Sequence, residues 1–144
     1  MELLKLARRP AVMLPPEMTV REAAAVMAQR GVGAVVITNP DKQVLGIFTE
    51  RDNLLRVTNK GLDPYMTQLA EVMTAPVQTV PPETPVEQGL TLMIQNRLRH
   101  LPIVDSTHHV LGIASLRYLL MRRIGEQQSS IETLAAFASA GGPG

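Results

Sequence analysis

Apolar and polar residues recur along the chain with two periods, and each period indicates a different kind of element. Between Thr19 and Arg30 the apolar residues follow the three- and four-residue spacing of one helix face, and the same spacing returns at residues 86–94. The stretches 34–38 (AVVIT) and 101–104 (LPIV) are short, apolar and partly β-branched, as in buried strands. The pattern therefore predicts a helix followed by a strand, twice.

A turn and a second strand follow each of these predicted strands. The turn-forming sequences NPDKQ and DSTHH lead into VLGIF and VLGIA, so residues 34–48 and 101–114 each predict an antiparallel hairpin. A second helix is expected to begin at Thr49 and at Ser115. An extended, proline-terminated stretch precedes each first helix, so each block has the order β-α-β-β-α.

The two blocks are repeats of one sequence pattern. Shifted by 66 positions, residues 9–56 fall on residues 75–122 without a gap, and Pro-Pro-Glu and Val-Leu-Gly-Ile match in both copies. A repeated unit usually cannot bury its apolar face alone and packs against its neighbour. We expect the first repeat over 8–60, a linker over 61–75, the second repeat over 76–124, and, over 125–144, a terminal helix (about 130–138) with a flexible end.

Composition narrows the classes of function. The 144 residues fit one compact domain, or two small ones with a shared core, of class α/β (α+β). The net charge is +1 and the basic residues are scattered, so no nucleic-acid partner is expected. The N-terminus lacks the order of a signal peptide, and no segment has the roughly 18 apolar residues of a membrane span. Since cysteine is also absent, we expect a cytoplasmic protein with no disulfide, no metal site and no membrane association.

The sequence Thr-Glu-Arg-Asp after the first hairpin has two interpretations. Thr49 as a helix N-cap, with Asp52 three residues later, is a capping pattern in which each side chain bonds the other residue's backbone N–H. The same helix start favours a phosphate, and the two oxygens of Asp52 suit the vicinal hydroxyls of a ribose. The residues alone leave both interpretations open.

Three motifs in tandem units, GVGAVVI, VLGIFTERD and RHLPIVD, resemble a pair of CBS domains, also called a Bateman module, over about residues 8–123. The resemblance implies tandem β-α-β-β-α repeats packed about a pseudo-two-fold axis, with two clefts between them. It also implies a regulatory module, here standing alone, that binds adenosine nucleotides or related adenosyl ligands, controls a partner protein and forms a dimer.

The resemblance assigns ligand contacts to particular residues. The family motif G-h-x-[ST]-x-x-D matches Gly46, Thr49 and Asp52, with the acid at the ribose. The second unit keeps Ser115 but has Tyr118 in place of the acid, and a phenol is a poorer partner for two hydroxyls. We therefore expect one nucleotide per chain, in the cleft of Thr49 and Asp52.

Further contacts are expected where the strands and units start. The small stretch 31–34 suits a flat base, and the basic residues after the second unit's first helix suit phosphates; for Arg51, Arg99 and His100 a purely local or solvated role stays open. The candidates for the nucleotide site are Thr49, Asp52, Gly31, Val32, Gly33, Ala34, Arg99, His100, Arg51, Val77 and Thr79, and those for a possible second site are Val12, Ser115 and Tyr118.

The sequence thus predicts a regulatory sensor and not an enzyme, because it holds no Ser-His-acid or metal-ligand constellation with credible spacing. No cofactor is required; the expected ligand is AMP or ADP, with ATP and other adenosyl ligands as alternatives. A homodimer is expected because the second helices carry apolar residues that a small unit pair has difficulty covering: Leu54, Leu55, Leu119, Leu120 and Met121. The regulated effector protein is unknown, and the alternative is a scaffold that dimerises without a ligand.

Overall fold

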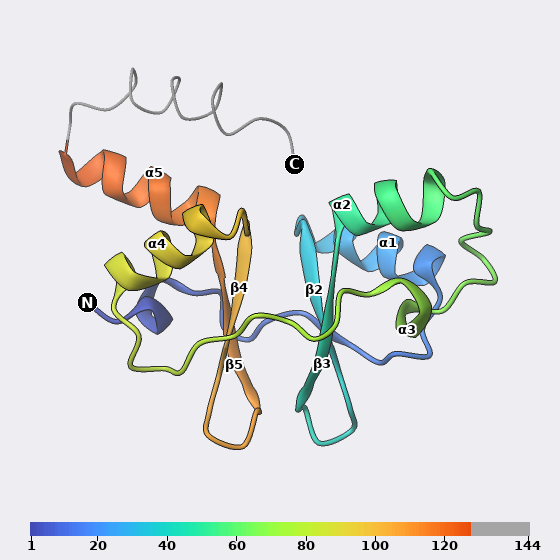
Figure 1. The fold of residues 1–144 in the computed structure, drawn as a ribbon, viewed down its shortest axis with the longest axis horizontal. Helices are drawn as coiled ribbons and strands as arrows, with labels where there is room; N and C mark the ends of the chain where they lie inside the picture. The colour runs from blue at the N-terminus through green and yellow to red at the C-terminus, as the bar shows by residue number, and fades with distance from the viewer. Residues whose placement is uncertain (128–144) are drawn as a thin grey trace.

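The first unit folds as the hydrophobic pattern predicts. The computed structural model describes residues 1–127, so the terminal helix predicted at 130–138 lies outside the described residues. In the first sheet, β1 runs parallel to β2, and β2 runs antiparallel to β3 (Figure 1). The elements of this unit are β1 (Met13–Leu14), α1 (Val20–Arg30), β2 (Ala34–Thr38), β3 (Val44–Thr49), α2 (Glu50–Asp52) and the π-helix η2 (Asn53–Thr58).

The second unit repeats this order. Strands β4 and β5 form an antiparallel hairpin, and a parallel bridge from Val80 to Ile103 takes the place of β1. The elements here are α4 (Val86–Gln95), β4 (His100–Val104), β5 (Val110–Ser115) and α5 (Leu116–Gln127). The short helix α3 (Leu69–Val72) lies in the sequence between the units, and the 3₁₀-helix η1 (Leu3–Leu6) opens the chain. The predicted fold class and the doubled β-α-β-β-α order are confirmed. No helix within residues 1–127 is both long and apolar enough to cross a membrane.

Helix α1 begins and ends where its sequence predicts. Thr19 is the N-cap and forms a capping box with Glu22: the Thr19 Oγ1 accepts from the Glu22 N–H at 3.2 Å, and the Thr19 N–H donates to Glu22 Oε1 at 3.1 Å. Gly31 ends the helix in the left-handed region, with φ 64°, where glycine is favoured. This turn fixes the direction in which residues 32–34 leave the helix for β2.

The pseudo-two-fold relation is visible in the hairpin turns. Lys42 and His108, 66 positions apart, both have a positive φ, of 65° and 66°. The turns bond each other reciprocally: the Val44 N–H donates to the His108 carbonyl at 3.0 Å, and the Val110 N–H donates to the Lys42 carbonyl at 3.1 Å. The two units therefore meet along their hairpins, with the turns at one end of the molecule and α2 and α5 at the other (Figure 1).

Each unit also receives a backbone segment that leads into the other unit. Thr74, which precedes the second unit, exchanges two backbone bonds with Ile47 of β3, of 2.8 and 3.0 Å. Arg8, which precedes the first unit, exchanges two with Ile113 of β5, of 2.9 and 3.2 Å. The chain thus crosses between the units twice, at positions 66 residues apart.

Apolar anchors hold these crossing segments. Leu3 of η1 is fully buried in the core of the second unit, where it packs against Gly89 of α4. Leu69 of α3, 66 positions later, is fully buried in the core of the first unit. Each core is therefore completed by a short helix lying in the sequence before the other unit. A third cluster joins the units and includes Ala34, Val36, Ile47 and Ile113.

The motif glycines make room for the crossings. A Cβ added at Gly46 would lie 2.8 Å from the Thr74 carbonyl oxygen, and one at Gly112 would lie 2.9 Å from the Arg8 carbonyl oxygen. Both distances are shorter than ordinary carbon–oxygen contacts, and the facing atoms belong to the backbone, which has little freedom to move. The repeated Leu-Gly-Ile is therefore a requirement of the crossing strands, whatever the units bind.

We expect Gly46→Ala to destabilise the protein by about 1–3 kcal/mol, because the added methyl group forces Thr74 away from β3. Chemical denaturation monitored by circular dichroism measures the loss. Gly125→Ala, in α5, is the matched control: its Cβ meets no atom within 4 Å, and alanine favours the helix by about 1 kcal/mol. Equal stability of Gly46→Ala and the parent protein would show that the crossing tolerates a side chain.

Candidate functional site

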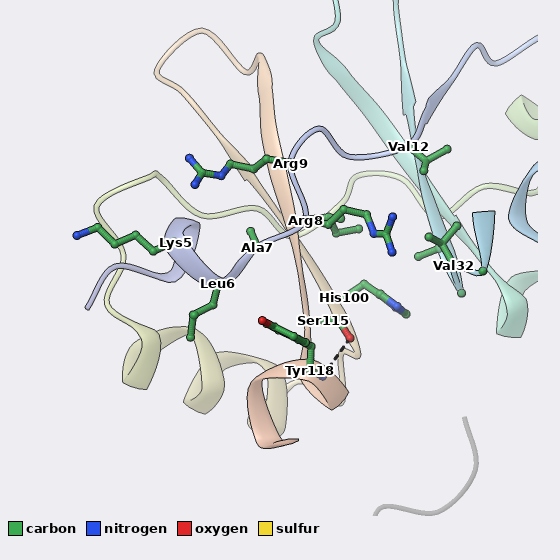
Figure 2. Close-up of a pocket in the computed structure, with 14 residues that line it drawn as sticks. Lys5, Leu6, Ala7, Arg8, Arg9, Val12, Val32, His100, Ser115 and Tyr118 are labelled. Carbon is green, nitrogen blue, oxygen red and sulfur yellow. Dashed lines mark hydrogen bonds between the residues drawn. The ribbon is translucent and has the colours of Figure 1, made fainter. Parts of the chain in front are cut away.

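A pocket of about 460 Å³ lies between the two units. This volume is within the usual range of small-molecule sites, roughly 300–1,000 Å³. Residues from the N-terminal segment, the first unit and the second unit all contribute to it (Figure 2). The lining residues are Lys5, Leu6, Ala7, Arg8, Arg9, Val12, Gly31, Val32, Gly33, Ala34, His100, Ile113, Ser115 and Tyr118.

The first unit contributes mostly backbone and small side chains. The stretch 31–34 turns out of α1 through Gly31, and the Val32 N–H is bonded to the Met27 carbonyl at 3.0 Å. The Gly33 carbonyl accepts from the Glu50 N–H at 3.0 Å, so this stretch is held firmly against the start of α2. Gly31 and Gly33 bring no side chains of their own, but the Glu50 carboxyl group packs beside Gly33, 3.4–3.5 Å from where a Cβ would stand there.

The N-terminal segment forms the opposite wall. Its backbone is fixed by the bonds between Arg8 and Ile113 described above. In Figure 2 the Arg8 side chain extends toward His100 and Val32, whereas Lys5 and Arg9 extend the other way. Within residues 1–127 the structure forms no ion pair to Arg8. The pocket therefore faces a cation that is not neutralised by any described carboxylate.

His100 opens β4 and faces the same pocket. Burial, with a smaller contribution from the neighbouring positive charge of Arg99, lowers the pKa of His100 from 6.5 to about 4. The imidazole is therefore neutral at pH 7 and has one N–H donor and one acceptor nitrogen. It adds a hydrogen-bonding group to the pocket without adding charge.

Ser115 and Tyr118 close the pocket at the start of α5. The Ser115 Oγ accepts from the Tyr118 N–H at 3.4 Å, a long bond (Figure 2). The Tyr118 side chain is 47% exposed, and its ring points toward the side of the pocket that carries Leu6 and Ala7. The phenol thus stands where a ligand entering between the N-terminal segment and α5 would meet it.

The Thr49–Asp52 pair lies outside this pocket and forms a capping box. Asp52 Oδ2 accepts from the Thr49 N–H at 3.0 Å and from the Thr49 Oγ1 at 3.1 Å, and the Asp52 N–H donates back to that Oγ1 at 3.1 Å. The Thr74 Oγ1 donates to Asp52 Oδ1 at 3.0 Å, and the Arg56 Nε lies 3.6 Å from the same oxygen. Asp52 is 8% exposed, so both its oxygens are engaged inside the protein.

The structure groups the candidate residues differently from the sequence-based expectation. Gly31–Ala34 and His100, assigned to the cleft of Thr49 and Asp52, line the pocket together with Val12, Ser115 and Tyr118, which were assigned to the second site. Arg51 and Arg99 are exposed and lie outside the lining. Val77 packs against the cluster that joins the units, and Thr79 is partly buried outside the pocket. The reason is the crossing topology, which brings the start of β2 next to the start of α5.

Sequence reasoning missed the whole N-terminal wall. Residues 5–9 and Ile113 line the pocket, whereas the repeat described above begins at Arg9. Carried further, the 66-residue register places Leu3 on Leu69 and Arg8 on Thr74. Since Leu3 and Leu69 both prove to be fully buried, the longer register would have indicated that residues 3–8 belong to the repeat and lie beside the other unit.

We expect His100 to titrate near pH 4 in the free protein, because its burial disfavours the charged imidazolium. Above about pH 6.5 the residue is neutral in both folded and unfolded chains; as the pH falls toward 4, only the unfolded chain takes up this proton, so stability decreases. A proton NMR titration measures the pKa directly. His100→Gln should flatten the stability profile between pH 6.5 and 5, and a His100 midpoint near 6.5 would contradict the expectation.

Comparisons with known proteins agree with this architecture. The sequence family described as the CBS domain matches residues 3–52 and 69–125. The CBS domain-containing protein YhcV of Bacillus subtilis is 35% identical over 115 residues, which cover 79% of each chain. An uncharacterized Methanopyrus kandleri protein, MK0525, is 34% identical over 116 residues, which cover 81% of this chain. The chain spans 59–62% of the length of several curated relatives that it matches.

Solved structures show the same arrangement of two units. A CBS-domain protein from Burkholderia ambifaria is 31% identical with a TM-score of 0.80, over 90% of this chain and 96% of that one. The CBS domain pair of protein MJ0100, solved with 5′-methylthioadenosine and S-adenosyl-L-methionine, has a TM-score of 0.78 at 20% identity, over 88% and 98% of the two chains. From the match of both repeats and the identity of these relatives, the chain belongs to the CBS-domain family and carries a tandem pair of the domains.

Proposed function

We propose that this chain is a regulatory module that binds an adenine nucleotide, with AMP or ADP preferred, in the pocket between its units. The observation that supports it is the pocket itself: about 460 Å³, with walls from both units and from the N-terminal segment that precedes the first unit. Ligand sites in proteins are typically concave, largely preformed and of this size. The MJ0100 pair, which shares the fold, was solved with two adenosyl compounds, and this supports the class of ligand.

The pocket supplies the contacts that a nucleoside needs. The side chains of Val12, Val32 and Ile113 provide apolar surface for a base, next to the open main chain of residues 31–34. The hydroxyl groups of Ser115 and Tyr118 and the neutral imidazole of His100 offer hydrogen bonds to a sugar. Polar groups of this kind around an apolar surface fix the orientation of a ligand.

The Asp52 carboxylate is the less favoured place for the ribose. Its oxygens already accept three hydrogen bonds of 3.0–3.1 Å from Thr49 and Thr74. A ribose there would have to displace the Thr74 hydroxyl or use the remaining lone pair of an 8% exposed residue. Leaving a buried partner unsatisfied costs about 1–3 kcal/mol, whereas the pocket beside Tyr118 needs no such exchange.

Binding in this place suits regulation. The pocket walls belong to both units, so a ligand bound there contacts the two units at the same time. A ligand shifts a conformational equilibrium only by its differential affinity for the states, and a site at a joint offers such a difference. We propose that the output is a change in the association of this chain with an effector protein.

A second candidate function is dimerisation as a scaffold, without a ligand. At the end of the molecule opposite the hairpin turns, η2 exposes Leu54 (60%) and Leu55 (43%), and α5 exposes Met121 (50%) (Figure 1). The expectation was wrong for Leu119, which is buried in the core of the second unit, and for Leu120, which packs against that core. These helices occupy equivalent places in the two units, so a two-fold partner would cover both in one contact. Exposed apolar surface of this kind marks an interaction site. We propose a homodimer through this face, compatible with either function.

We expect a thermal-shift screen with AMP, ADP, ATP, NAD, S-adenosylmethionine and GTP to respond most strongly to AMP or ADP. A ligand at about 100 times its dissociation constant stabilises the folded state by about 2.7 kcal/mol. Calorimetric titration should then give one site per chain. Tyr118→Ala should weaken binding several-fold, since it removes a pocket wall, whereas Asp52→Asn should chiefly lower the melting temperature. The reverse pattern would place the ligand at Thr49 and Asp52, and a blank screen would favour the scaffold.

We expect the protein to sediment as a dimer at tens of micromolar, because η2 and α5 expose Leu54, Leu55 and Met121, and a two-fold contact would cover these apolar side chains. The double variant Leu54→Glu/Met121→Glu introduces charge at both helices and should produce a monomer. Ile94→Glu is the matched control: Ile94 of α4 is 49% exposed and lies outside the proposed interface, so this variant should remain dimeric. A parent protein that sediments as a monomer would remove the proposed interface.

A further inference from the structure

The repeat symmetry relates the pocket to the Thr49–Asp52 capping box. Asp52 and Tyr118 are 66 positions apart, and so are Thr74 and Arg8. In the first unit Thr74 and Asp52 are hydrogen-bonded: the Thr74 Oγ1 donates to Asp52 Oδ1 at 3.0 Å. At the equivalent place in the second unit, the acid is replaced by a phenol and the hydroxyl by a guanidinium, and both line the pocket.

These two replacements change the sign of the charge: the first unit has the Asp52 carboxylate, whereas the equivalent position pair in the second unit has the Arg8 guanidinium and no acid. The pocket is lined by Lys5, Arg8, Arg9 and the neutral His100, and its lining includes no aspartate or glutamate, although the Glu50 carboxyl group packs beside the lining residue Gly33. Arg8 is the cation whose side chain extends toward the first unit, above His100 (Figure 2). No described residue forms an ion pair with it. An acid at position 118 would add a negative charge to the pocket that Arg8 also lines, whereas the phenol adds none.

We propose that the pocket selects its ligand by negative charge, with Arg8 binding the phosphate of the nucleotide and thereby discriminating nucleotides from uncharged or cationic adenosyl compounds. The inference rests on the proposed function and names the determinant of its specificity. It assigns recognition to a residue outside the family motif, on the segment that precedes the first unit.

The chemistry of these side chains supports the assignment. A guanidinium offers paired N–H donors that match two oxygens of a phosphate. The Tyr118 hydroxyl is a further donor in the same pocket, on the side of Leu6 and Ala7, and a neutral phenol does not repel an anion as a carboxylate does. A sulfonium, as in S-adenosylmethionine, carries a positive charge that Arg8 would repel. Among compounds that share the adenosine group, affinity for the pocket should therefore increase with the negative charge of the compound.

Folding of the Arg8 variants is not expected to be a difficulty. The bonds that hold the segment to β5 use the Arg8 backbone N–H and carbonyl, which any residue except proline provides. The Arg8 side chain is exposed, so its replacement by glutamine removes charge without opening a core. The melting temperature of the ligand-free variant verifies this point before binding is compared.

The experiment is a calorimetric series with adenosine, 5′-methylthioadenosine, S-adenosylmethionine, AMP and ADP, on the parent protein, Arg8→Gln, Arg8→Lys and Arg21→Gln. Arg21 is the matched control: it is exposed, lies outside the pocket and stacks on Tyr65 at 5.9 Å. The parent protein should bind AMP about tenfold to a hundredfold more tightly than adenosine. Arg8→Gln should abolish that difference, Arg8→Lys should keep part of it, and Arg21→Gln should keep it all.

The outcomes separate this inference from the proposed function. Equal affinity for adenosine and AMP in the parent protein, or an undiminished preference in Arg8→Gln, would overturn charge selection while leaving nucleoside binding in place. Tighter binding of S-adenosylmethionine than of AMP would overturn it in the same way. If none of the five compounds binds, the proposed function fails, and the inference fails with it. Added salt should weaken the binding of AMP but not the binding of adenosine, because the proposed contact between Arg8 and the phosphate is between charges.

Discussion

The structure depends on one arrangement of backbone, the exchange of leading segments between the units. Arg8 bonds to Ile113 and Thr74 bonds to Ile47, so each unit is completed by the chain that leads into the other. Without these crossings the two cores would lose Leu3 and Leu69, both fully buried. The glycines at 46 and 112 follow from the same arrangement, since a Cβ would collide with the crossing carbonyls. Duplication of the sequence is thus a duplication of this interlocking contact.

The same exchange explains why two equivalent places have different properties. Each crossing places one residue on the side of the opposite unit's second helix: Thr74 bonds Asp52, and Arg8 lines the same pocket as Tyr118. In the first case a hydroxyl and an acid bond each other, and the helix is capped from both sides. In the second case no hydrogen bond joins the Arg8 and Tyr118 side chains, and both line a pocket. Two substitutions in a symmetric frame thus distinguish a closed structural contact from an open pocket.

Much of the fold could be predicted from the sequence, because periodicity and local signals specify it. Thr19 with Glu22 and Gly31 mark the ends of α1, and the doubled Val-Leu-Gly-Ile places β3 and β5. The grouping of site residues could not be predicted in the same way. Whether Gly31–Ala34 faces Asp52 or Tyr118 depends on which unit each leading segment joins, and no short motif records this. The π-helix over Asn53–Thr58 was not predicted either, since residues 53–58 follow a capping box that also suits an α-helix.

The position of Arg8 connects ligand binding with the association of the units. Its backbone holds β5 of the second unit, while its side chain faces the pocket wall of the first. A phosphate bound by this side chain would add its binding free energy to the contact that joins the units, and by linkage the tighter joint would bind phosphate better. The opposite crossing has no such dependence, because Thr74 finds its partner within the protein. A ligand of the proposed kind would therefore strengthen the contact between Arg8 and β5 but not the equivalent contact between Thr74 and β3. An effector protein could recognise the resulting difference between the two units.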